Sequence, residues 1–429
     1  MLSLFLRYIT KTVSLVVSIL FLAVFLFALA RTFFPRNKRV KEVLSPFVSR
    51  EDESRKWERR CFFAALAMGL MLLAVFFVNC LYFYRGQGLN SAMEQFFVEK
   101  SIDAPHYKNL AQWGYDGTAE NFPEQFRMIV FFPLFPWIMR PFVRIGIPFY
   151  PMAMLLNLFF FSAGIALAYR VIRRRFQHQT ALWSVVFLVL MPGSFFFVMP
   201  MTESLFLFLS FAFLDCVETE RFWSAGLLGV LAGLTRSPGL LLAGLAGAAM
   251  ILDLQQKGTK KIPLKWIFPV LGPCLGIGGY LLLNQIKYGT PFAFLIHQAE
   301  RWGQTFESVG SVLEGLVDRG LGWWLREPDA VVYVAIWNIA MILIELGLLA
   351  WTARKLPSSW LLHGLVYFAM VNGAATLLSG PRYALGMPAL CPAMALACRR
   401  DWQKGAVAGF LFAMQGLYYL AFLRKLAIY

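Results

Sequence analysis

Residues 61–81 read CFFAALAMGLMLLAVFFVNCL, an apolar run without a charged side chain. A helix that crosses the hydrocarbon core of a bilayer needs about 20 such residues. Residues 13–30 form a second run of the same kind. Strands of a membrane β-barrel alternate apolar and polar side chains over about ten residues, and neither run alternates in this way. The two runs therefore predict membrane-spanning α-helices in an all-α, polytopic helical bundle.

The composition extends this prediction to the whole chain. The 429 residues are 59% hydrophobic and 15% charged, whereas about a quarter of the residues in a soluble domain are charged. A net charge of +16 would favour nucleic acid as the partner of a soluble protein. Here the basic residues gather in short segments between apolar runs, as they do in cytoplasmic loops. We therefore expect a multi-pass integral membrane protein that contacts the lipid bilayer and no nucleic acid.

The basic segments also set the expected orientation. Residues 31–60 hold ten Lys and Arg residues, which places this segment in the cytoplasm and the N-terminus outside. We divide the chain into an N-terminal extension, residues 1–60, with one helix and this basic loop, and a membrane domain, residues 61–429. The polar segments 85–127 and 284–329 then lie outside the cytoplasm, where we expect interfacial helices. The aromatic run 128–138 that follows the first segment is too short to span the bilayer, and we expect it to be an interfacial or re-entrant piece. The predicted spans number roughly twelve, at about 13–30, 61–84, 149–169, 181–199, 204–217, two within 222–254, 266–283, 330–352, 360–378, 384–398 and 405–423.

The polar motifs that interrupt the apolar pattern all fall on the expected extracytoplasmic side. The first contains Asp103, His106 and Tyr107. A loop aspartate most often faces solvent or caps a helix. An unperturbed Asp has a pKa of about 3.9 and is ionised at neutral pH, and as a general base it can speed a reaction by roughly 10²–10⁴-fold. His106 would lie on the same side of a helical turn as Asp103, and Asp116 is a second candidate base.

Three further charged residues, Glu203, Arg236 and Arg382, stand at breaks between apolar runs. A carboxylate at a helix start is favoured by the helix dipole, and an arginine near a helix end can snorkel to the membrane surface. A guanidinium group is also always charged and binds phosphate in a bidentate manner. Two arginines at breaks on one face therefore predict an anionic, phosphate-bearing ligand. The second outer segment contains Gln298 and Trp302. Its aromatic residues either belong to the aromatic belt of the membrane surface, stack on a sugar or line a lipid groove.

Taken in order, these motifs resemble the PIG-V family, which comprises GPI mannosyltransferase II and its bacterial relatives in the GT-C glycosyltransferase superfamily. The resemblance covers about residues 61–420. In two places this chain departs from the family pattern, since Ile102 replaces a Trp before the aspartate and Thr290 replaces an acidic residue. The pieces that match are Asp103-Ala104-Pro105-His106-Tyr107, Leu110-Ala111, Gly114-Tyr115, Phe131-Phe132-Pro133-Leu134-Phe135-Pro136, Thr202-Glu203-Ser204-Leu205-Phe206, Leu234-Thr235-Arg236-Ser237-Pro238-Gly239, Tyr288-Gly289-Thr290-Pro291 through Trp302, and Arg382-Tyr383.

The resemblance implies a GT-C fold and an inverting transfer of a mannosyl or other hexosyl residue. The donor would be a polyprenyl- or dolichyl-phosphate sugar, and the acceptor would be a hydroxyl group of a lipid or glycan on the extracytoplasmic face. Asp103 would act as the base with His106 beside it, and Arg236 and Arg382 would hold the leaving phosphate. The other residues expected to contact substrates are Tyr107, Asp116, Glu203, Gln298, Trp302 and Tyr383.

No cofactor other than the donor is expected, and no cluster of residues with metal-ligand spacing predicts a metal. The sequence contains no Asn-x-Ser/Thr sequon. This absence favours the bacterial inner membrane over the endoplasmic reticulum as the location.

Two other classes of function remain open from the sequence. A lipid or solute transporter or flippase would also have broken helices with charged ends. Such a protein is expected to contain inverted repeats and ionisable residues near the middle of the bilayer, whereas the charged motifs here gather at one edge. A non-catalytic scaffold subunit with the same fold is the third interpretation.

Overall fold

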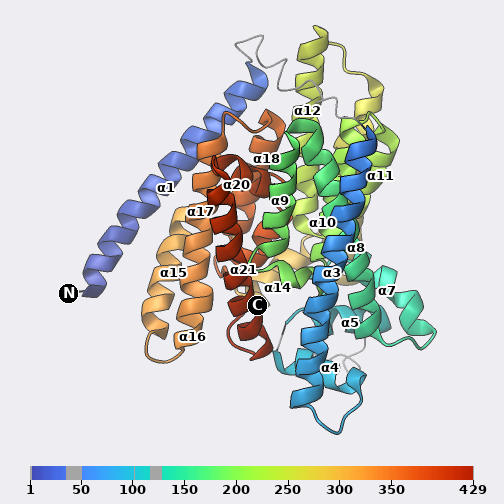
Figure 1. Cartoon of the computed structure of the whole chain (residues 1–429), viewed down its shortest axis with the longest axis vertical. Helices are drawn as coiled ribbons and strands as arrows, with labels where there is room; N and C mark the ends of the chain where they lie inside the picture. Colours follow the sequence, from blue (N-terminus) through green and yellow to red (C-terminus); the bar gives the residue numbers. More distant parts are fainter. Residues whose placement is uncertain (1, 35–50, 101, 116–127, 429) are drawn as a thin grey trace.

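The computed structural model of the protein describes residues 2–34, 51–100, 102–115 and 128–428. Within these residues the fold is all helical, and strand-type pairing is confined to one isolated bridge between Phe306 and Ala374. Figure 1 shows the helices side by side in a single bundle.

The helices are named in chain order, with η for short 3₁₀ or π segments. The first part of the chain contains α1 (Leu2–Phe33), α3 (Glu51–Phe83), α4 (Leu89–Lys100), α5 (Ala104–Trp113), α7 (Leu134–Arg144), α8 (Phe149–Arg175), α9 (His178–Leu190), η1 (Ser194–Val198), α10 (Glu203–Glu218), α11 (Phe222–Gly233), η2 (Ser237–Leu240) and α12 (Leu241–Lys257). The second part contains η3 (Leu264–Trp266), α13 (Ile267–Tyr288), α14 (Ala293–Trp302), α15 (Val309–Trp323), α16 (Pro328–Ala330), η4 (Val331–Ile336), α17 (Trp337–Thr352), α18 (Ser358–Asn372), α19 (Gly380–Tyr383), η5 (Ala384–Gly386), α20 (Leu390–Ala397) and α21 (Asp401–Leu423).

Seven helices in the described part of the chain are long and apolar enough to cross a membrane. They are Leu6–Phe33, Ser54–Phe83, Phe149–Arg175, Ser237–Lys257, Leu264–Tyr288, Pro328–Thr352 and Asp401–Leu423. The prediction of a helical membrane bundle is confirmed at this level. Other predicted spans form the shorter helices α9, α10, α11, α18 and α20, of 8 to 16 residues. Three of these, α10, α11 and α18, adjoin breaks in the helical path that carry Glu203, Arg236 and Arg382.

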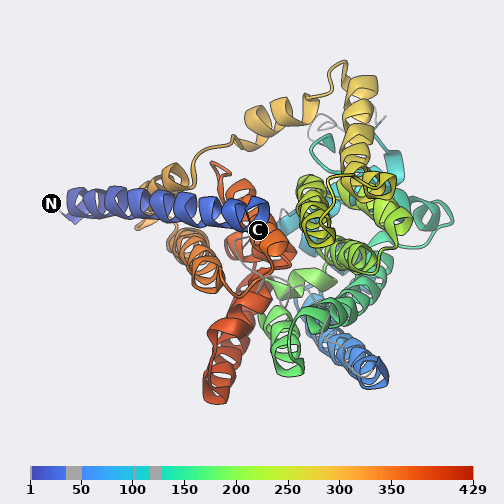
Figure 2. The same cartoon turned by 90° about the horizontal axis from the view of Figure 1, so that it is seen from above.

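The helices pack as a set of neighbouring pairs around a common core. The most extensive contacts are those of α11 with α13, α10 with α8, α3 with α8, and α10 with α11. The N-terminal helix α1 packs against α15 and α18, and in the view of Figure 2 it reaches outward from the bundle. Much of its apolar surface is exposed, including Leu15, Val16 and Leu22. Such a surface is suited to contact with lipid.

Glycines allow α11 and α13 to approach at backbone distance. A Cβ atom on Gly272 would lie 2.2 Å from the carbonyl oxygen of Gly226, and one on Gly276 would lie 2.2 Å from that of Val230. Small residues at such spacing are a common basis for close helix packing in membranes, where dispersion and not the hydrophobic effect holds helices together. This tight pair fixes the end of α11, from which Arg236 follows.

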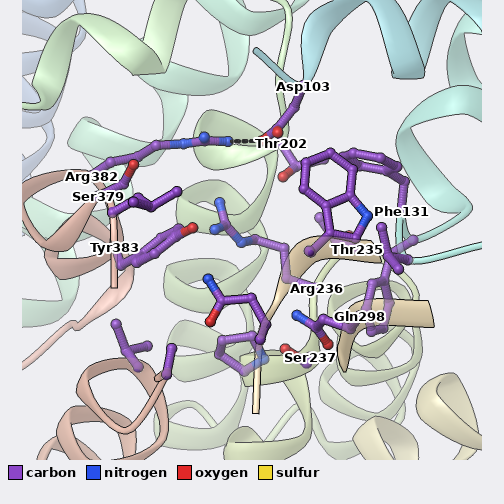
Figure 3. A pocket seen from close by; sticks show the side chains of 18 of the residues that line it. Asp103, Phe131, Thr202, Thr235, Arg236, Ser237, Gln298, Ser379, Arg382 and Tyr383 are labelled. Atoms are coloured by element: carbon purple, nitrogen blue, oxygen red, sulfur yellow. Dashed lines mark hydrogen bonds and ion pairs between the residues drawn. The ribbon is translucent and has the colours of Figure 1, made fainter. Parts of the chain in front are cut away.

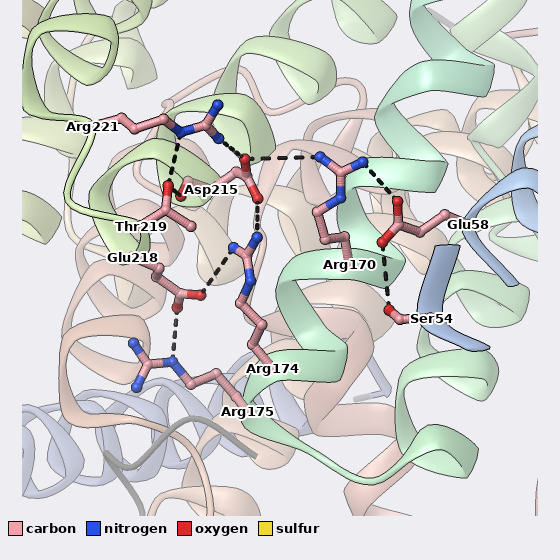
Figure 4. A network of polar contacts seen from close by, with 9 residues as sticks. All are labelled: Ser54, Glu58, Arg170, Arg174, Arg175, Asp215, Glu218, Thr219 and Arg221. Atoms are coloured by element: carbon pink, nitrogen blue, oxygen red, sulfur yellow. Dashed lines mark hydrogen bonds and ion pairs between the residues drawn. The ribbon is translucent and has the colours of Figure 1, made fainter. Parts of the chain in front are cut away.

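Ion pairs join the ends of α8 and α10 at the side predicted to be cytoplasmic (Figure 4). Arg174 Nη2 lies 2.7 Å from Asp215 Oδ1, and Arg175 Nε donates to Glu218 Oε1 over 2.8 Å. A further arginine of α8, Arg170, donates to Glu58 of α3 over 2.6 Å. These contacts fix the relative positions of three helices at the end away from the polar breaks.

Short helices gather at the opposite end of the bundle. The helices α4, α5 and α7 lie in the lower part of the view in Figure 1, next to the lower ends of α3 and α8. In the predicted segment 128–138, a turn leads to Pro133, and α7 begins at Leu134 and continues to Arg144. Proline suits this position because its fixed φ and missing N–H are compatible with a helix start.

Candidate functional site

A cavity of about 310 Å³ lies where the breaks in the helices converge. Its lining comes from six separate parts of the chain: the start of α5, the turn before α7, the start of α10, the break after α11, α14 with the residues just after it, and the end of α18 with the region that follows it. The polar or charged lining residues include Asp103, Tyr107, Thr202, Thr235, Arg236, Ser237, Gln298, Gln304, Ser379, Arg382 and Tyr383, and the apolar ones include Ile102, Val130, Phe131, Phe132, Phe294, Trp302, Met370, Val371 and Leu378 (Figure 3).

Four charged groups from distant parts of the chain form one cluster here. Arg382 donates from Nη2 to Asp103 Oδ2 over 2.6 Å and from Nε to Glu203 Oε1 over 2.7 Å. Arg236 donates from Nη1 to the same Glu203 oxygen over 2.5 Å. Glu203 therefore bridges two guanidinium groups, while Asp103 is bound to one. With two arginines and two carboxylates, the cluster has no net charge.

Burial differs sharply within the cluster. The side chains of Glu203 and Arg382 are 2% and 5% exposed, and those of Arg236 and Asp103 are 18% and 27% exposed. Glu203 therefore lies at the buried bottom of the cluster, and Asp103 and Arg236 are the members nearest the cavity. The second oxygen of Glu203, Oε2, is buried and has no hydrogen-bond partner in the described part of the chain.

Two members of the cluster keep unused hydrogen-bonding capacity. Within residues 2–34, 51–100, 102–115 and 128–428, the guanidinium of Arg236 makes only its bond to Glu203, although it has five N–H donors. Over the same residues, Asp103 uses only Oδ2. In Figure 3 the Arg236 side chain lies in the middle of the cavity, between Tyr383 and Gln298. The site can therefore take an anion on Arg236 and a hydrogen-bond donor on Asp103.

Local structure explains the position of each charged side chain. Asp103 immediately precedes α5, which has Pro105 in its first turn. Glu203 is the first residue of α10, where the helix dipole favours a negative charge. Arg236 has an extended backbone between α11 and η2, so its side chain leaves the helical path. Arg382 lies in the one-turn helix α19.

Aromatic side chains form the wall beside Asp103. The ring of His106 stacks on Phe131 with a centroid distance of 4.9 Å, and Trp302 meets both rings edge-on. Tyr107 is buried, and its hydroxyl oxygen lies 3.5 Å from that of Thr202. Burial raises the pKa of Tyr107, so its hydroxyl stays protonated at neutral pH.

The cavity brings together most of the residues predicted from the sequence. Those that line it are Asp103, Tyr107, Arg236, Gln298, Trp302, Arg382 and Tyr383. Glu203 lies beneath the lining and holds both arginines. His106 is not among the lining residues, but its ring stacks on that of Phe131, which does line the cavity. Asp116, the second candidate base, lies outside the described residues.

Several polar lining residues were not singled out from the sequence. Thr235, Ser237 and Ser379 line the cavity beside the two arginines. The signal for them was present, because they belong to the same breaks, T-R-S and S-G-P-R, as Arg236 and Arg382.

Two buried ionisable residues lie away from the breaks that carry the charged motifs. Glu345 and His363 lie inside the apolar helices α17 and α18, and both are buried. Their signal was also visible, since each is the sole ionisable side chain in a long apolar run.

Within the described residues, no group of three or more His, Cys, Asp or Glu side chains could hold a metal ion. Comparison with protein-family models, with curated proteins and with solved structures finds no match for this chain. The resemblance to the PIG-V family therefore remains a prediction.

Proposed function

We propose that the protein is a GT-C membrane glycosyltransferase of the PIG-V type. It transfers a mannosyl or other hexosyl residue, with inversion, from a polyprenyl- or dolichyl-phosphate sugar to a hydroxyl group of a lipid or glycan acceptor. In this proposal the chain crosses the membrane about twelve times and its cavity opens on the extracytoplasmic face. A bacterial inner membrane is the proposed location, with the endoplasmic reticulum as the alternative.

One observation carries the proposal: Asp103, Arg236 and Arg382 meet around Glu203 at one cavity. The residues come from segments far apart in the sequence, and Asp103 and Arg382 are 279 positions apart. A carboxylate next to two guanidinium groups is the minimum set that such a transfer needs, namely a base for the acceptor and cations for the phosphate.

The chemistry follows from the positions of these groups. The phosphate of the donor binds the unused N–H groups of Arg236 and those of Arg382. The acceptor oxygen attacks the anomeric carbon and loses its proton to Asp103, while the bond from that carbon to the phosphate oxygen breaks. The departing lipid phosphate is a stable anion held by the arginines, so it needs no general acid. A glycoside hydrolase, in contrast, uses two carboxylates because its leaving group must be protonated.

The remaining lining supports a donor with both a sugar and a lipid chain. The polar side chains of Thr202, Thr235 and Gln298 offer hydrogen bonds to sugar hydroxyls. Phe131 and Trp302 present aromatic faces and edges, and the apolar lining residues offer a surface for the first part of a lipid chain. Mixed linings of this kind are typical of small-molecule sites, with a few polar groups that fix orientation.

The test is transfer of radiolabel from polyprenyl-phosphate mannose to a membrane lipid extract by the purified protein. Asp103→Asn should abolish transfer while donor binding remains. The matched control is Asp401→Asn, because Asp401 has a side chain that is 91% exposed at the start of α21, and this variant should be as active as wild type. If Asp103→Asn transfers label at the wild-type rate, Asp103 is not the base.

A transporter or flippase is the second candidate, and the buried Glu345 and His363 are the observation that favours it. The same protein is therefore placed in vesicles that contain labelled polyprenyl-phosphate mannose in one leaflet. Movement of the donor across the bilayer without sugar transfer would favour the transporter function over the enzyme function. Neither movement nor transfer, together with intact donor binding, would support the non-catalytic scaffold.

A further inference from the structure

The segment that carries Arg382 into the cavity is held by side chains of several neighbouring elements, including Arg319 of α15, which donates to the carbonyl of Ala375 over 2.9 Å, and Gln304, which donates to that of Thr376 over 2.7 Å. We name residues 373–379, which join α18 to α19, the strap. Asn338 of α17 donates from Nδ2 to the carbonyl of Leu377 over 3.1 Å and accepts from the N–H of Gly380 over 2.5 Å. Tyr367 of α18 donates from its hydroxyl to the carbonyl of Tyr383 over 3.0 Å. The strap and the helix after it are thus tied on both sides of Arg382.

A further contact next to the strap is a buried hydrogen-bonded pair between Glu345 and Asn372. Glu345 lies seven residues after Asn338 on α17, about two helical turns along the same face, and Asn372 is the last residue of α18. Asn372 Nδ2 donates to Glu345 Oε2 over 2.9 Å. The side chains are almost fully enclosed, since Glu345 is 1% and Asn372 is 0% exposed.

Each residue of this pair has one buried oxygen without a partner. These atoms are Glu345 Oε1 and Asn372 Oδ1, and neither finds a donor among the described residues. Within the described residues, no cation or hydroxyl of the elements around α17 donates to either oxygen, although Arg319 of α15 and His363 of α18 themselves have buried ring or guanidinium nitrogens without a partner. Arg382 of α19 is bound to the two site carboxylates, Tyr367 is bound to Tyr383, and Arg31 of α1 donates to the carbonyl of Leu356 over 3.2 Å.

One proton shared between Glu345 Oε1 and Asn372 Oδ1 would give both oxygens a hydrogen-bond partner. Two acceptor oxygens cannot bond to each other, but a carboxylic acid can donate its O–H to an amide oxygen. A proton on Oε1 directed at Oδ1 would close a ring with two hydrogen bonds, and it would remove a charge that is costly to bury without a counter-ion.

We propose that Glu345 is a neutral carboxylic acid in the folded protein. It pairs with Asn372 through two hydrogen bonds and acts as a positioning residue that sets the strap and, through it, Arg382. The effect on Arg382 as a phosphate ligand rests on the proposed function, whereas the protonation state of Glu345 does not.

Infrared spectroscopy and thermal unfolding of the purified full-length protein test the protonation state. The difference spectrum between wild type and Glu345→Gln at neutral pH should contain a carbonyl band of a protonated acid, which is absent from the difference between wild type and Glu327→Gln, a control at an exposed position. Glu345→Gln should unfold at the wild-type temperature because an amide can form the same two bonds with Asn372, whereas Glu345→Leu should unfold earlier. No acid band, or Glu345→Gln as unstable as Glu345→Leu, would overturn the proposal.

Hydrogen exchange tests the positioning role without reference to activity. Exchange in residues 373–383 should be about tenfold faster in Glu345→Leu, in line with the loss of the paired hydrogen bonds, and normal in Glu345→Gln. Unchanged exchange in Glu345→Leu would overturn the positioning role. Binding of polyprenyl phosphate should weaken in parallel with the faster exchange. If wild type does not bind polyprenyl phosphate, the proposed function fails. The infrared and hydrogen-exchange results would still decide the protonation state of Glu345 and its positioning role.

Discussion

Replacing Glu203 by glutamine removes the carboxylate that holds two guanidinium groups, and its cost follows from burial. The Glu203 side chain is 2% exposed and that of Arg382 is 5% exposed. Removing one partner of a buried ion pair costs about 3–5 kcal/mol, because the remaining charge stays buried without compensation. Glu203→Gln would leave two arginines with only Asp103, so we expect a loss of about 3–5 kcal/mol in the free energy of unfolding.

Asp103→Asn provides the comparison within the same cluster. Asp103 is 27% exposed, so water partly solvates its ion pair, and Arg382 keeps its bond to Glu203 when Asp103 is replaced. The expected loss is about 1–2 kcal/mol, between that of an exposed ion pair and that of a hydrogen bond to a buried charge.

The assay is equilibrium unfolding of both variants and the wild type in the same mixed micelles, with helix content and tryptophan fluorescence as independent probes. Agreement between the two probes justifies a two-state free energy. Equal losses of unfolding free energy in the two variants, or a Glu203→Gln variant as stable as wild type, would show that Glu203 does not hold the cluster from its buried side.

Three further changes test contacts elsewhere. Gly380→Ala adds a Cβ atom 2.5 Å from Asn338 Oδ1, so we expect a loss of about 1–3 kcal/mol and a lower melting temperature; an unchanged melting temperature would contradict the position of the strap. The hydrogen bond from Lys425 lowers the pKa of Glu99 from 4.5 to about 2, so the stability from this carboxylate is present above pH 4.5 and is lost as the pH falls toward 2. Glu99→Gln should flatten this part of the stability curve, and identical curves for both proteins would argue against the contact. Lys100→Met removes the donor to two carbonyls near the C-terminus, which should speed hydrogen exchange in residues 424–428, whereas unaltered exchange would count against that role.

The helical nature of the bundle could be predicted because it depends on local sequence. The apolar run 61–81 lies within α3, and an uninterrupted apolar run of that length allows no other fold in a membrane. The positions of Arg236 and Arg382 at breaks could be predicted for the same reason. Pro238 and Pro381 interrupt the apolar pattern, and both arginines occur outside long helices in the structure.

Partner choice within the site could not be predicted, because it depends on contacts between distant segments. Nothing local to Glu203 indicates that it lies beneath the cavity and bridges two arginines. The orientation of His106 toward Phe131 depends on where the turn before α7 packs. Glu345 was visible in the sequence as a lone carboxylate in an apolar run, but its partner Asn372 is set by the packing of α17 on α18.

The separation of Asp103 from Arg382 has a consequence for how the protein is made. The Glu203–Arg236 pair spans 33 residues and can form as soon as α11 emerges, whereas the bond between Asp103 and Arg382 spans 279 residues. At a synthesis rate of roughly 5–20 residues per second, Asp103 waits about 14–56 s for its partner. Until Arg382 is made, the nascent chain contains at most Asp103, Glu203 and Arg236 of the four charged residues in the cluster. The cluster therefore closes only when nearly the whole bundle has been made, and an interrupted chain cannot contain the complete cluster.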